Sequence, residues 1–175
     1  MENRVKQKKF VSLVLYLHNT QNEVVPFFQK VLPVFRDNFT NFEIVCVNDA
    51  CTDGTIGVLK EYLEENHCSE MVNIIHMSFF HGLESAMNAG RDLAIGDFIY
   101  EFDTAYVDYP SELIMEVYDK LLEGNDIVSA GTRDHVRMTS GFFYFCYNKT
   151  SRGRGKIGPE TFRIVFRLAI NRIKS

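Results

Sequence analysis

The first 130 residues alternate between two hydrophobic periodicities. Short runs of continuous apolar residues are typical of strands buried on both faces of a sheet, and longer segments with an apolar residue every three or four positions are typical of helices that cover it. Strands are predicted at 10–17, 42–47, 71–77, 98–102 and 126–130, and helices at 23–35, 55–65, 82–94 and 111–122. Such alternation predicts an α/β domain with a doubly wound, mostly parallel sheet between two helical layers.

The C-terminal segment, residues 135–175, differs from this core in charge and pattern. It holds nine Lys or Arg and one acid, Glu160, and since the whole chain has a net charge of −4, the segment is +8 and residues 1–134 are −12. We interpret 1–134 as an α/β core and 135–175 as a basic, aromatic-containing helical segment of the same domain. A short helix is predicted at 138–148 and a basic amphipathic helix at 160–174. The basic residues either form a solvated face or contact an anionic partner.

Composition excludes several classes of protein. A length of 175 residues suits one domain, and the longest apolar run, 142–147, is far too short to span a membrane. Four cysteines without a C-x-x-C pair indicate neither a zinc site nor a disulfide framework. The basic N-terminus leads into a predicted strand and not into a signal-peptide core with a cleavage site, so we expect a cytoplasmic protein. No nucleic-acid partner is expected, because the core is acidic and the basic segment lacks a recognition motif.

Acidic residues follow two of the predicted strands. Asp49 comes after strand 42–47, and Asp103 comes directly after strand 98–102. Open α/β sheets bind ligands at the carboxyl ends of their strands, so both carboxylates are expected near one crevice. Asp103 can hold Mg²⁺ or Mn²⁺, because a cation bound by one carboxylate can neutralise a departing diphosphate. The alternative is that Asp103 caps the next turn.

Further polar residues of the predicted loops have both a ligand-binding and a structural interpretation. Asp49 can accept a hydrogen bond from the ring N–H of uracil or guanine, or it can organise the turn that follows. For Asp53, the Asp-Gly-Thr sequence favours a turn and a helix N-cap over contact with a nucleotide. Gly82 and Asn88 belong to a segment that opens a helix, and the first amides of that helix can face a phosphate or a sugar.

In this order, these residues resemble the inverting family-two glycosyltransferases with the GT-A fold, in particular the polyprenyl-phosphate sugar transferases related to dolichol-phosphate mannose synthase. The resemblance covers nearly the whole chain and rests on residues 11–19, 47–55, 82–97, 102–112, 131–133, 143–148 and 162–164. It implies a Rossmann-like three-layer sandwich in which residues 1–134 form the core that binds a nucleotide-sugar donor. Leu17 and Asn19 then stand in the nucleotide-contacting turn after the first strand.

Three polar positions depart from the family pattern. Thr20 replaces a Glu, Ala105 replaces the second metal-site Asp, and Thr161 replaces the Asp expected as catalytic base. Glu160 is then the first candidate for the general base and Asp134 the second. The departures leave open another class of function, a glycosyltransferase-like module that binds a nucleotide or a partner subunit without catalysis.

The resemblance implies transfer of a sugar, with inversion, from a UDP- or GDP-sugar to a polyprenyl phosphate or a glycan. A polyprenyl phosphate is already an anionic nucleophile and needs little base catalysis. Arg133, Arg137 and Arg163 are the side chains expected to pair with its phosphate. The aromatic stretch 142–147 would rest in the membrane interface or pack on the sheet as a core helix. With such an acceptor, the protein is expected at the inner face of the membrane as a peripheral protein.

Overall fold

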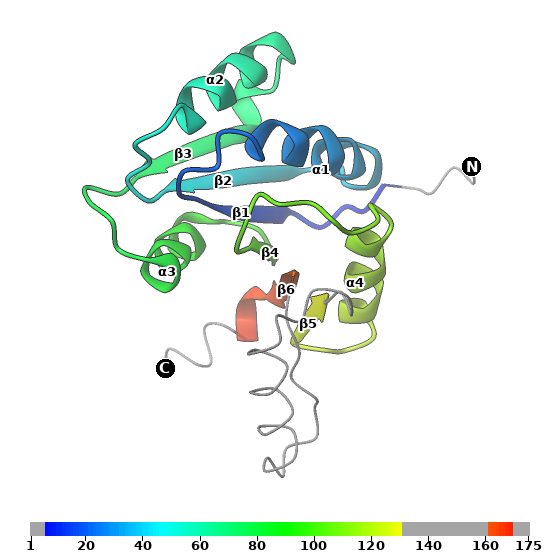
Figure 1. The fold of residues 1–175 in the computed structure, drawn as a ribbon. Coiled ribbons are helices and arrows are strands. Elements are labelled where there is room, and N and C mark those ends of the chain that lie inside the picture. The colour runs from blue at the N-terminus through cyan, green and yellow to red at the C-terminus, as the bar shows by residue number, and fades with distance from the viewer. Residues whose placement is uncertain (1–5, 131–160, 170–175) are drawn as a thin grey trace.

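The computed structural model describes residues 6–130 and 161–169 and shows the expected alternation of strands and helices (Figure 1). The predicted elements of the first 130 residues are all present, with ends that differ from the predictions by three residues or fewer. In chain order, the observed elements of the described residues are β1 (Val11–Leu17), α1 (Val24–Asn38), β2 (Phe42–Asn48), α2 (Thr55–Glu65), the 3₁₀ turn η1 (Ser69–Met71), β3 (Val72–His76), α3 (Leu83–Leu93), β4 (Phe98–Phe102), α4 (Leu113–Leu122), β5 (Ile127–Ala130) and β6 (Phe162–Phe166).

The six strands form one sheet in the order β3-β2-β1-β4-β6-β5. Strands β1 to β4 run parallel to one another, and β6 runs antiparallel to both β4 and β5. Helices α1, α2 and α4 share one hydrophobic core with the sheet, whereas α3 packs on its opposite face (Figure 1). The expected three-layer sandwich with a mostly parallel sheet is therefore confirmed.

The prediction of a helix over 160–174 was wrong for residues 162–166, whereas residues 167–169 are helical and residues 160 and 170–174 lie outside the described part of the chain. Residues 162–166 form β6, which inserts between β4 and β5 and pairs Glu101 with Arg163. Phe162 and Ile164 alternate toward the large core, with 2% and 0% exposure, so the segment fits a period of two as well as a helical period. Hydrogen-bonded pairing with the edge of β4 that β1 does not occupy favours the strand over the helix. The core sheet therefore extends beyond residue 134, while the predicted helix at 138–148 lies outside the described residues.

Helix α3 approaches the sheet closely because Gly90 has no side chain. A Cβ atom at this position would lie 2.4 Å from Val14 Cγ1 and 2.8 Å from Val47 Cγ2. Both valines belong to strands at the centre of the core that α3 covers. The absence of a Cβ thus sets the distance at which α3, and the loop that leads into it, lies over the sheet.

Gly90→Ala is expected to lower the free energy of unfolding by about 1–3 kcal/mol, because the methyl group overpacks this contact. Urea denaturation monitored by circular dichroism measures the change. The matched control is Gly57→Ala in α2, where an added Cβ meets no atom within 4 Å. That variant is expected to gain about 0.5–1 kcal/mol through reduced freedom of the unfolded chain. Equal stability of the two variants would contradict the close packing of α3.

Candidate functional site

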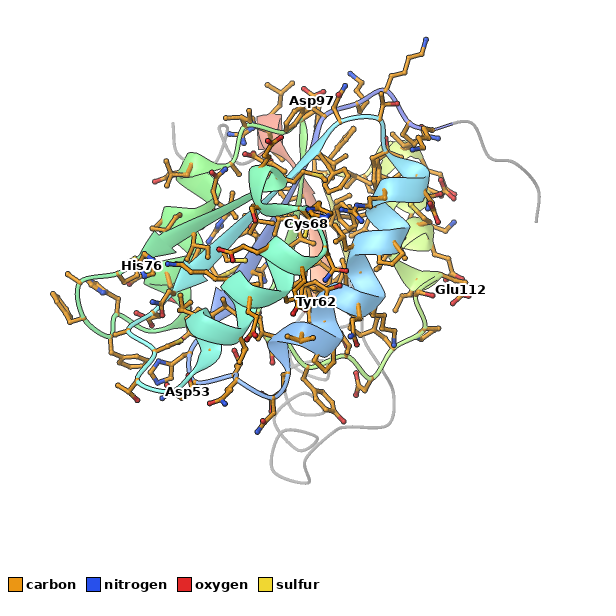
Figure 2. The ribbon with its side chains drawn as sticks, turned by 90° about the horizontal axis from the view of Figure 1, so that it is seen from above. Asp53, Tyr62, Cys68, His76, Asp97 and Glu112 are labelled. Atoms are coloured by element: carbon orange, nitrogen blue, oxygen red, sulfur yellow. The ribbon has the colours of Figure 1, made fainter. Side chains whose placement is uncertain are left out.

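The carboxyl ends of β1, β2, β3 and β4 meet at one edge of the sheet. Asp49 follows β2 and Asp103 follows β4, and β1 lies between these two strands. Figure 2 shows Asp53 at this edge, whereas Asp97, at the start of β4, lies at the opposite end of the sheet. The two acidic side chains singled out in the sequence therefore belong to the same edge, as expected.

The loop after β1 is fastened to the loop after β2 through Asn19. Its side-chain oxygen accepts hydrogen bonds from the Thr52 amide at 2.8 Å, the Thr52 hydroxyl at 3.3 Å and the Asp53 amide at 3.3 Å. Asn19 has a φ of 53°, a conformation that asparagine adopts more readily than most residues. Leu17 is buried, and its carbonyl accepts the Asp49 amide at 2.9 Å. Nucleotide contact by Leu17 or Asn19 stays a prediction.

Asp53 organises the turn that leads into α2, which confirms the turn interpretation, but the N-cap of α2 is Gly54, so the N-cap part of the prediction was wrong. Its Oδ1 accepts the Thr55 hydroxyl at 2.5 Å and the Thr55 amide at 3.0 Å, and its Oδ2 accepts the Gln21 amide at 3.2 Å. Desolvation raises the pKa of Asp53, but the hydrogen bonds from Thr55 and Gln21 outweigh it and lower the pKa below its usual value. Direct contact of Asp53 with a nucleotide stays a prediction.

Asp53→Ala is expected to cost about 1 kcal/mol of stability at neutral pH, because the turn before α2 loses the hydrogen bonds from Thr55 and Gln21. Because the pKa of Asp53 is lowered by folding, its ionised form stabilises the protein above the pKa of the unfolded chain, and this contribution is lost as the pH falls through the folded-state pKa. Thermal unfolding at pH 7 and at acid pH measures the effect. The gap between the two proteins should shrink in acid, and a gap independent of pH would contradict the prediction.

Asp49 is fully buried and fastens the loop between β3 and α3 to the end of β2. Its Oδ1 accepts the His81 amide at 2.8 Å, and its Oδ2 accepts the Gly82 amide at 2.9 Å and the Tyr16 hydroxyl at 3.1 Å. Burial, followed by the hydrogen bond to Asp49, raises the pKa of Tyr16 to about 12. The carboxylate also lies at the N-terminus of α3, where the helix dipole favours negative charge.

These contacts bear on two of the predicted nucleotide-binding residues. Gly82, with a φ of 83°, presents its amide to Asp49, so that amide is already engaged. Because Asp49 is 0% exposed, a base can reach its carboxylate only if the residues that cover it move, and base recognition by Asp49 stays a prediction. Asn88 is exposed on α3, where its side-chain oxygen accepts a hydrogen bond from Arg91 at 2.7 Å, and its nucleotide contact is likewise untested.

Asp103 is half-buried at the carboxyl end of β4, and Ala105 is fully buried in the large core. Within residues 6–130 and 161–169, no group of three His, Cys, Asp or Glu side chains could hold a metal ion. One carboxylate still fits a magnesium-type ion, which commonly takes one or two protein carboxylates and completes its shell with substrate phosphates and water. The described donor set thus suits a metal that arrives with a diphosphate.

A buried ion-pair cluster, which the sequence analysis did not identify, lies two residues before Asp103. Glu101 is 1% exposed on β4. Its Oε2 accepts a hydrogen bond from Arg163 Nε at 2.5 Å, and its Oε1 lies 3.1 Å from Arg91 Nε without the geometry of a hydrogen bond. The sequence feature that could have indicated this cluster is a glutamate within an otherwise apolar strand. Phosphate binding by Arg163 stays a prediction.

Four of the predicted site residues lie outside the described part of the chain: Glu160, Asp134, Arg133 and Arg137. Thr161, at the position of the family's catalytic Asp, is described, and its amide donates to the Ala130 carbonyl at 2.7 Å. It holds the start of β6 against the end of β5. The general base and most of the acceptor-binding residues therefore remain sequence predictions.

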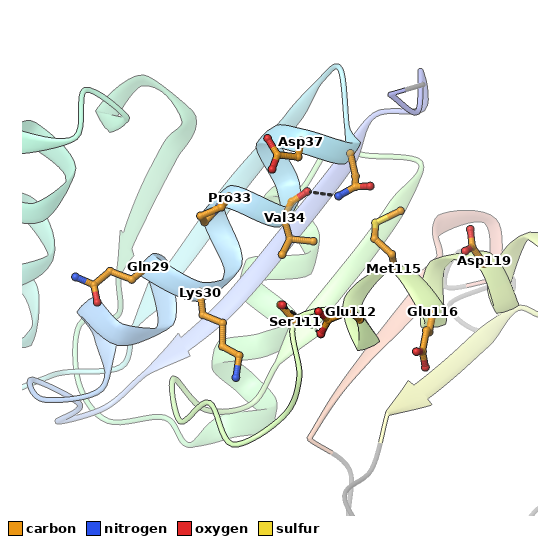
Figure 3. A pocket seen from close by; sticks show the side chains of 11 residues that line it. Gln29, Lys30, Pro33, Val34, Asp37, Ser111, Glu112, Met115, Glu116 and Asp119 are labelled. Atoms are coloured by element: carbon orange, nitrogen blue, oxygen red, sulfur yellow. Dashed lines mark hydrogen bonds between the residues drawn. The ribbon is translucent and has the colours of Figure 1, made fainter. Parts of the chain in front are cut away.

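A groove of about 750 Å³ lies between α1 and α4 (Figure 3). It is lined mainly by polar and acidic side chains, among them Lys30, Asp37, Glu112, Glu116 and Asp119. The groove contains neither Asp49 nor Asp103 and belongs to the helical layer. We therefore place the candidate site at the carboxyl edge of the sheet.

Comparison with known proteins identifies the family. Residues 12–174 match the family model for glycosyl transferase family 2. The chain belongs to this family. An uncharacterized glycosyltransferase of Synechocystis is 32% identical over 172 residues, covering 94% of this chain and 52% of the relative. A prophage bactoprenol glucosyl transferase homolog of Escherichia coli is 30% identical over 173 residues, covering 94% and 54%. The family-two chain thus spans about half the length of these relatives.

Solved structures share its fold. A mannosyltransferase from Pyrobaculum calidifontis, in complex with GDP-mannose and Mn²⁺, superposes with a TM-score of 0.70 at 16% identity, covering 95% of this chain and 47% of that one. Glucosyl-3-phosphoglycerate synthase from Mycobacterium tuberculosis, with Mn²⁺, UDP-glucose and phosphoglyceric acid, has a TM-score of 0.69 at 13% identity, covering 91% and 57%. In the described part of the family-two chain, no helix has the length and apolar character needed to cross a bilayer.

Proposed function

We propose that this chain binds a UDP- or GDP-sugar and transfers the sugar, with inversion, to a polyprenyl phosphate. The observation that carries the proposal is the common edge at which Asp103 and the loops of Asn19 and Asp49 meet in a family-two chain. Two structural neighbours contain Mn²⁺ together with GDP-mannose or UDP-glucose. The relative from Escherichia coli is named for bactoprenol, which favours a lipid-linked acceptor over a glycan.

Asp103 is the described side chain that would hold Mg²⁺ or Mn²⁺. A bound cation supplies positive charge that neutralises the diphosphate as it leaves the sugar. The buried Ala105 adds no carboxylate, so the remaining ligands would come from the diphosphate and from water. Asn19 and Asp49 keep the surrounding loops in a fixed arrangement through their hydrogen bonds to Thr52, His81 and Gly82.

The acceptor side of the site rests on residues around β6 and beyond. Arg133, Arg137 and Arg163 would pair with the acceptor phosphate. Glu160, or Asp134 as second candidate, would orient that phosphate or accept a proton from a hydroxyl acceptor. A lipid-phosphate acceptor would bring the protein to the inner face of the membrane as a peripheral protein. Thr161 in place of a catalytic Asp is compatible with a phosphate nucleophile, because that group is already ionised.

The experiment is a transfer assay with purified protein and Mn²⁺, in which UDP- and GDP-sugars are each combined with a polyprenyl phosphate in detergent or with a neutral glycan. Transfer to the polyprenyl phosphate, with the anomeric configuration inverted, is the expected result. Transfer to the glycan alone would contradict the proposed acceptor. Nucleotide binding without turnover on any acceptor would contradict catalysis.

A second candidate function is a nucleotide- or partner-binding module without transferase activity. The observation that favours it is the full burial of Ala105 at the position of the second metal-site carboxylate. Calorimetric titration with UDP and GDP, with and without Mn²⁺, separates the two functions. Tight binding that does not depend on metal, together with no turnover, favours the binding module, whereas binding strengthened by Mn²⁺ favours the transferase.

A further inference from the structure

Two aromatic side chains are exposed in the loop between β3 and α3, at the carboxyl edge of the sheet. Phe79 is 64% exposed and Phe80 is 57% exposed. Exposure of two adjacent phenyl rings leaves apolar surface in water, which is unfavourable unless a ligand or partner covers it. The proposed function uses neither ring. Their position beside the candidate donor site raises the question of what they contact.

Phe80 is held in place by a side chain from the loop after β1. Its ring centroid lies 4.7 Å from that of His18, with the planes tilted by 52°. His18 is itself fixed, because its Nδ1 lies within hydrogen-bonding distance, 2.7 Å, of the Asp49 carbonyl oxygen. One side of the Phe80 ring therefore packs against His18. More than half of the residue remains exposed to solvent.

The backbone that follows Phe80 is also fixed. The buried Asp49 carboxylate accepts the amides of His81 and Gly82 directly after it. Phe79 differs from Phe80 in its support, because its ring stacks on His81 within the same loop, with centroids 4.0 Å apart. Phe80 thus contacts the loop after β1, whereas the ring contact of Phe79 is with its own loop.

Phe80 and Asp103 belong to the same edge of the sheet. The Phe80 ring contacts His18, which follows β1, and β1 lies directly beside β4, the strand that Asp103 follows. Neighbouring strands are about 5 Å apart, so one nucleotide can lie across these loops. With the diphosphate beside Asp103, the base reaches the loops of His18 and Phe80.

We propose that the open face of Phe80, backed by His18, is the surface on which the base of the donor nucleotide stacks. Asp49 is then a positioning residue, since it fixes both the His81–Gly82 backbone and, through its carbonyl, the His18 ring. This inference rests on the proposed function and adds to it the residue that contacts the base. Stacking on an aromatic ring tolerates any base, so the hydrogen-bonding groups of the neighbouring loops would choose between uracil and guanine.

The first test compares Phe80→Ala with Phe79→Ala by calorimetric titration with UDP, GDP and inorganic pyrophosphate in the presence of Mn²⁺. Loss of one base–aromatic stack corresponds to about tenfold to a hundredfold weaker binding. Phe80→Ala is expected to show this loss for UDP and GDP and none for pyrophosphate, which has no base. Phe79→Ala, a change of the same residue type in the same loop, is expected to leave all three affinities within about twofold of the unaltered chain.

The second test uses Phe80→Trp, because the natural chain has no tryptophan. The new side chain retains an aromatic face and becomes the sole indole fluorophore of the protein. UDP and GDP are expected to quench its fluorescence with the same midpoint as the calorimetric titration, whereas pyrophosphate leaves the signal unchanged. Phe79→Trp, the control, is expected to respond weakly or not at all.

The outcomes separate this inference from the proposed function. UDP or GDP binding that Phe80→Ala leaves unchanged would overturn the stacking role alone, and equal losses in both alanine variants would assign the loop a general apolar role. Unchanged nucleotide affinity combined with lost flotation on phosphatidylcholine vesicles would identify a membrane contact and overturn the inference. Failure of the unaltered chain to bind UDP and GDP would contradict the proposed function and the inference together.

Discussion

Asp103→Asn is expected to reduce sugar transfer at least about a hundredfold, because the amide keeps the size of the side chain and removes the charge proposed to hold the divalent cation. The nucleotide should still bind, since the proposed contacts of its base are with other loops. The gain in UDP or GDP affinity on adding Mn²⁺ should disappear. Titration of each nucleotide with and without Mn²⁺, next to the transfer assay, measures both effects.

Asp97→Asn is the matched control for this change. Asp97 lies just before β4 and Asp103 just after it, so the two carboxylates mark opposite ends of one strand. The Asp97 side chain is 51% exposed, and its oxygen lies 3.9 Å from Lys9 Nζ, a distance at which a surface ion pair contributes little. Its variant should keep full activity and full Mn²⁺ dependence. Retained metal-dependent transfer in Asp103→Asn would contradict the proposed role of Asp103.

Much of the fold could be predicted because most buried strands and their covering helices carry distinct local patterns. The continuous apolar run of β1 indicates only a buried strand, and the hydrophobic period of α2 indicates only a helix. Residues 162–166 do not, because Phe162, Ile164 and Phe166 satisfy a period of two while Phe162, Val165 and Phe166 also satisfy a helical stripe. The deciding influence is an edge of β4, more than sixty residues away in the sequence. Local pattern contains no information about that edge.

The candidate site was predictable at the level of strands and much less so at the level of contacts. Asp49 and Asp103 follow buried strands, and parallel topology alone brings them to one edge. The burial of Asp49 involves backbone amides that lie 32 and 33 residues later in the chain. The spacing of residues in the sequence does not identify these amides as its partners. The Arg91–Glu101–Arg163 cluster joins a helix and two strands in the same way. An isolated glutamate in an apolar strand indicates a buried partner without saying which cation supplies it.

Arg163→Met is expected to lower the free energy of unfolding by about 3 kcal/mol, because it leaves the buried Glu101 carboxylate with Arg91 as its remaining recorded cationic partner. The side chain of Glu101 is 0% exposed, and its 2.5 Å contact with Arg163 joins β4 to β6. Arg163→Lys keeps the charge and loses the planar guanidinium, so its loss should be smaller. Urea denaturation monitored by circular dichroism measures both.

The double variant Glu101→Leu with Arg163→Met separates the structural role of Arg163 from its proposed role at the acceptor. Replacing both members of a buried ion pair with apolar groups is often close to neutral, so most of the lost stability should return. If Arg163 also binds the acceptor phosphate, this stable protein should still show a raised KM for polyprenyl phosphate and an unchanged affinity for UDP. Restored stability with a normal acceptor KM would confine Arg163 to the ion pair, and a double variant as unstable as Arg163→Met would contradict the buried-charge explanation.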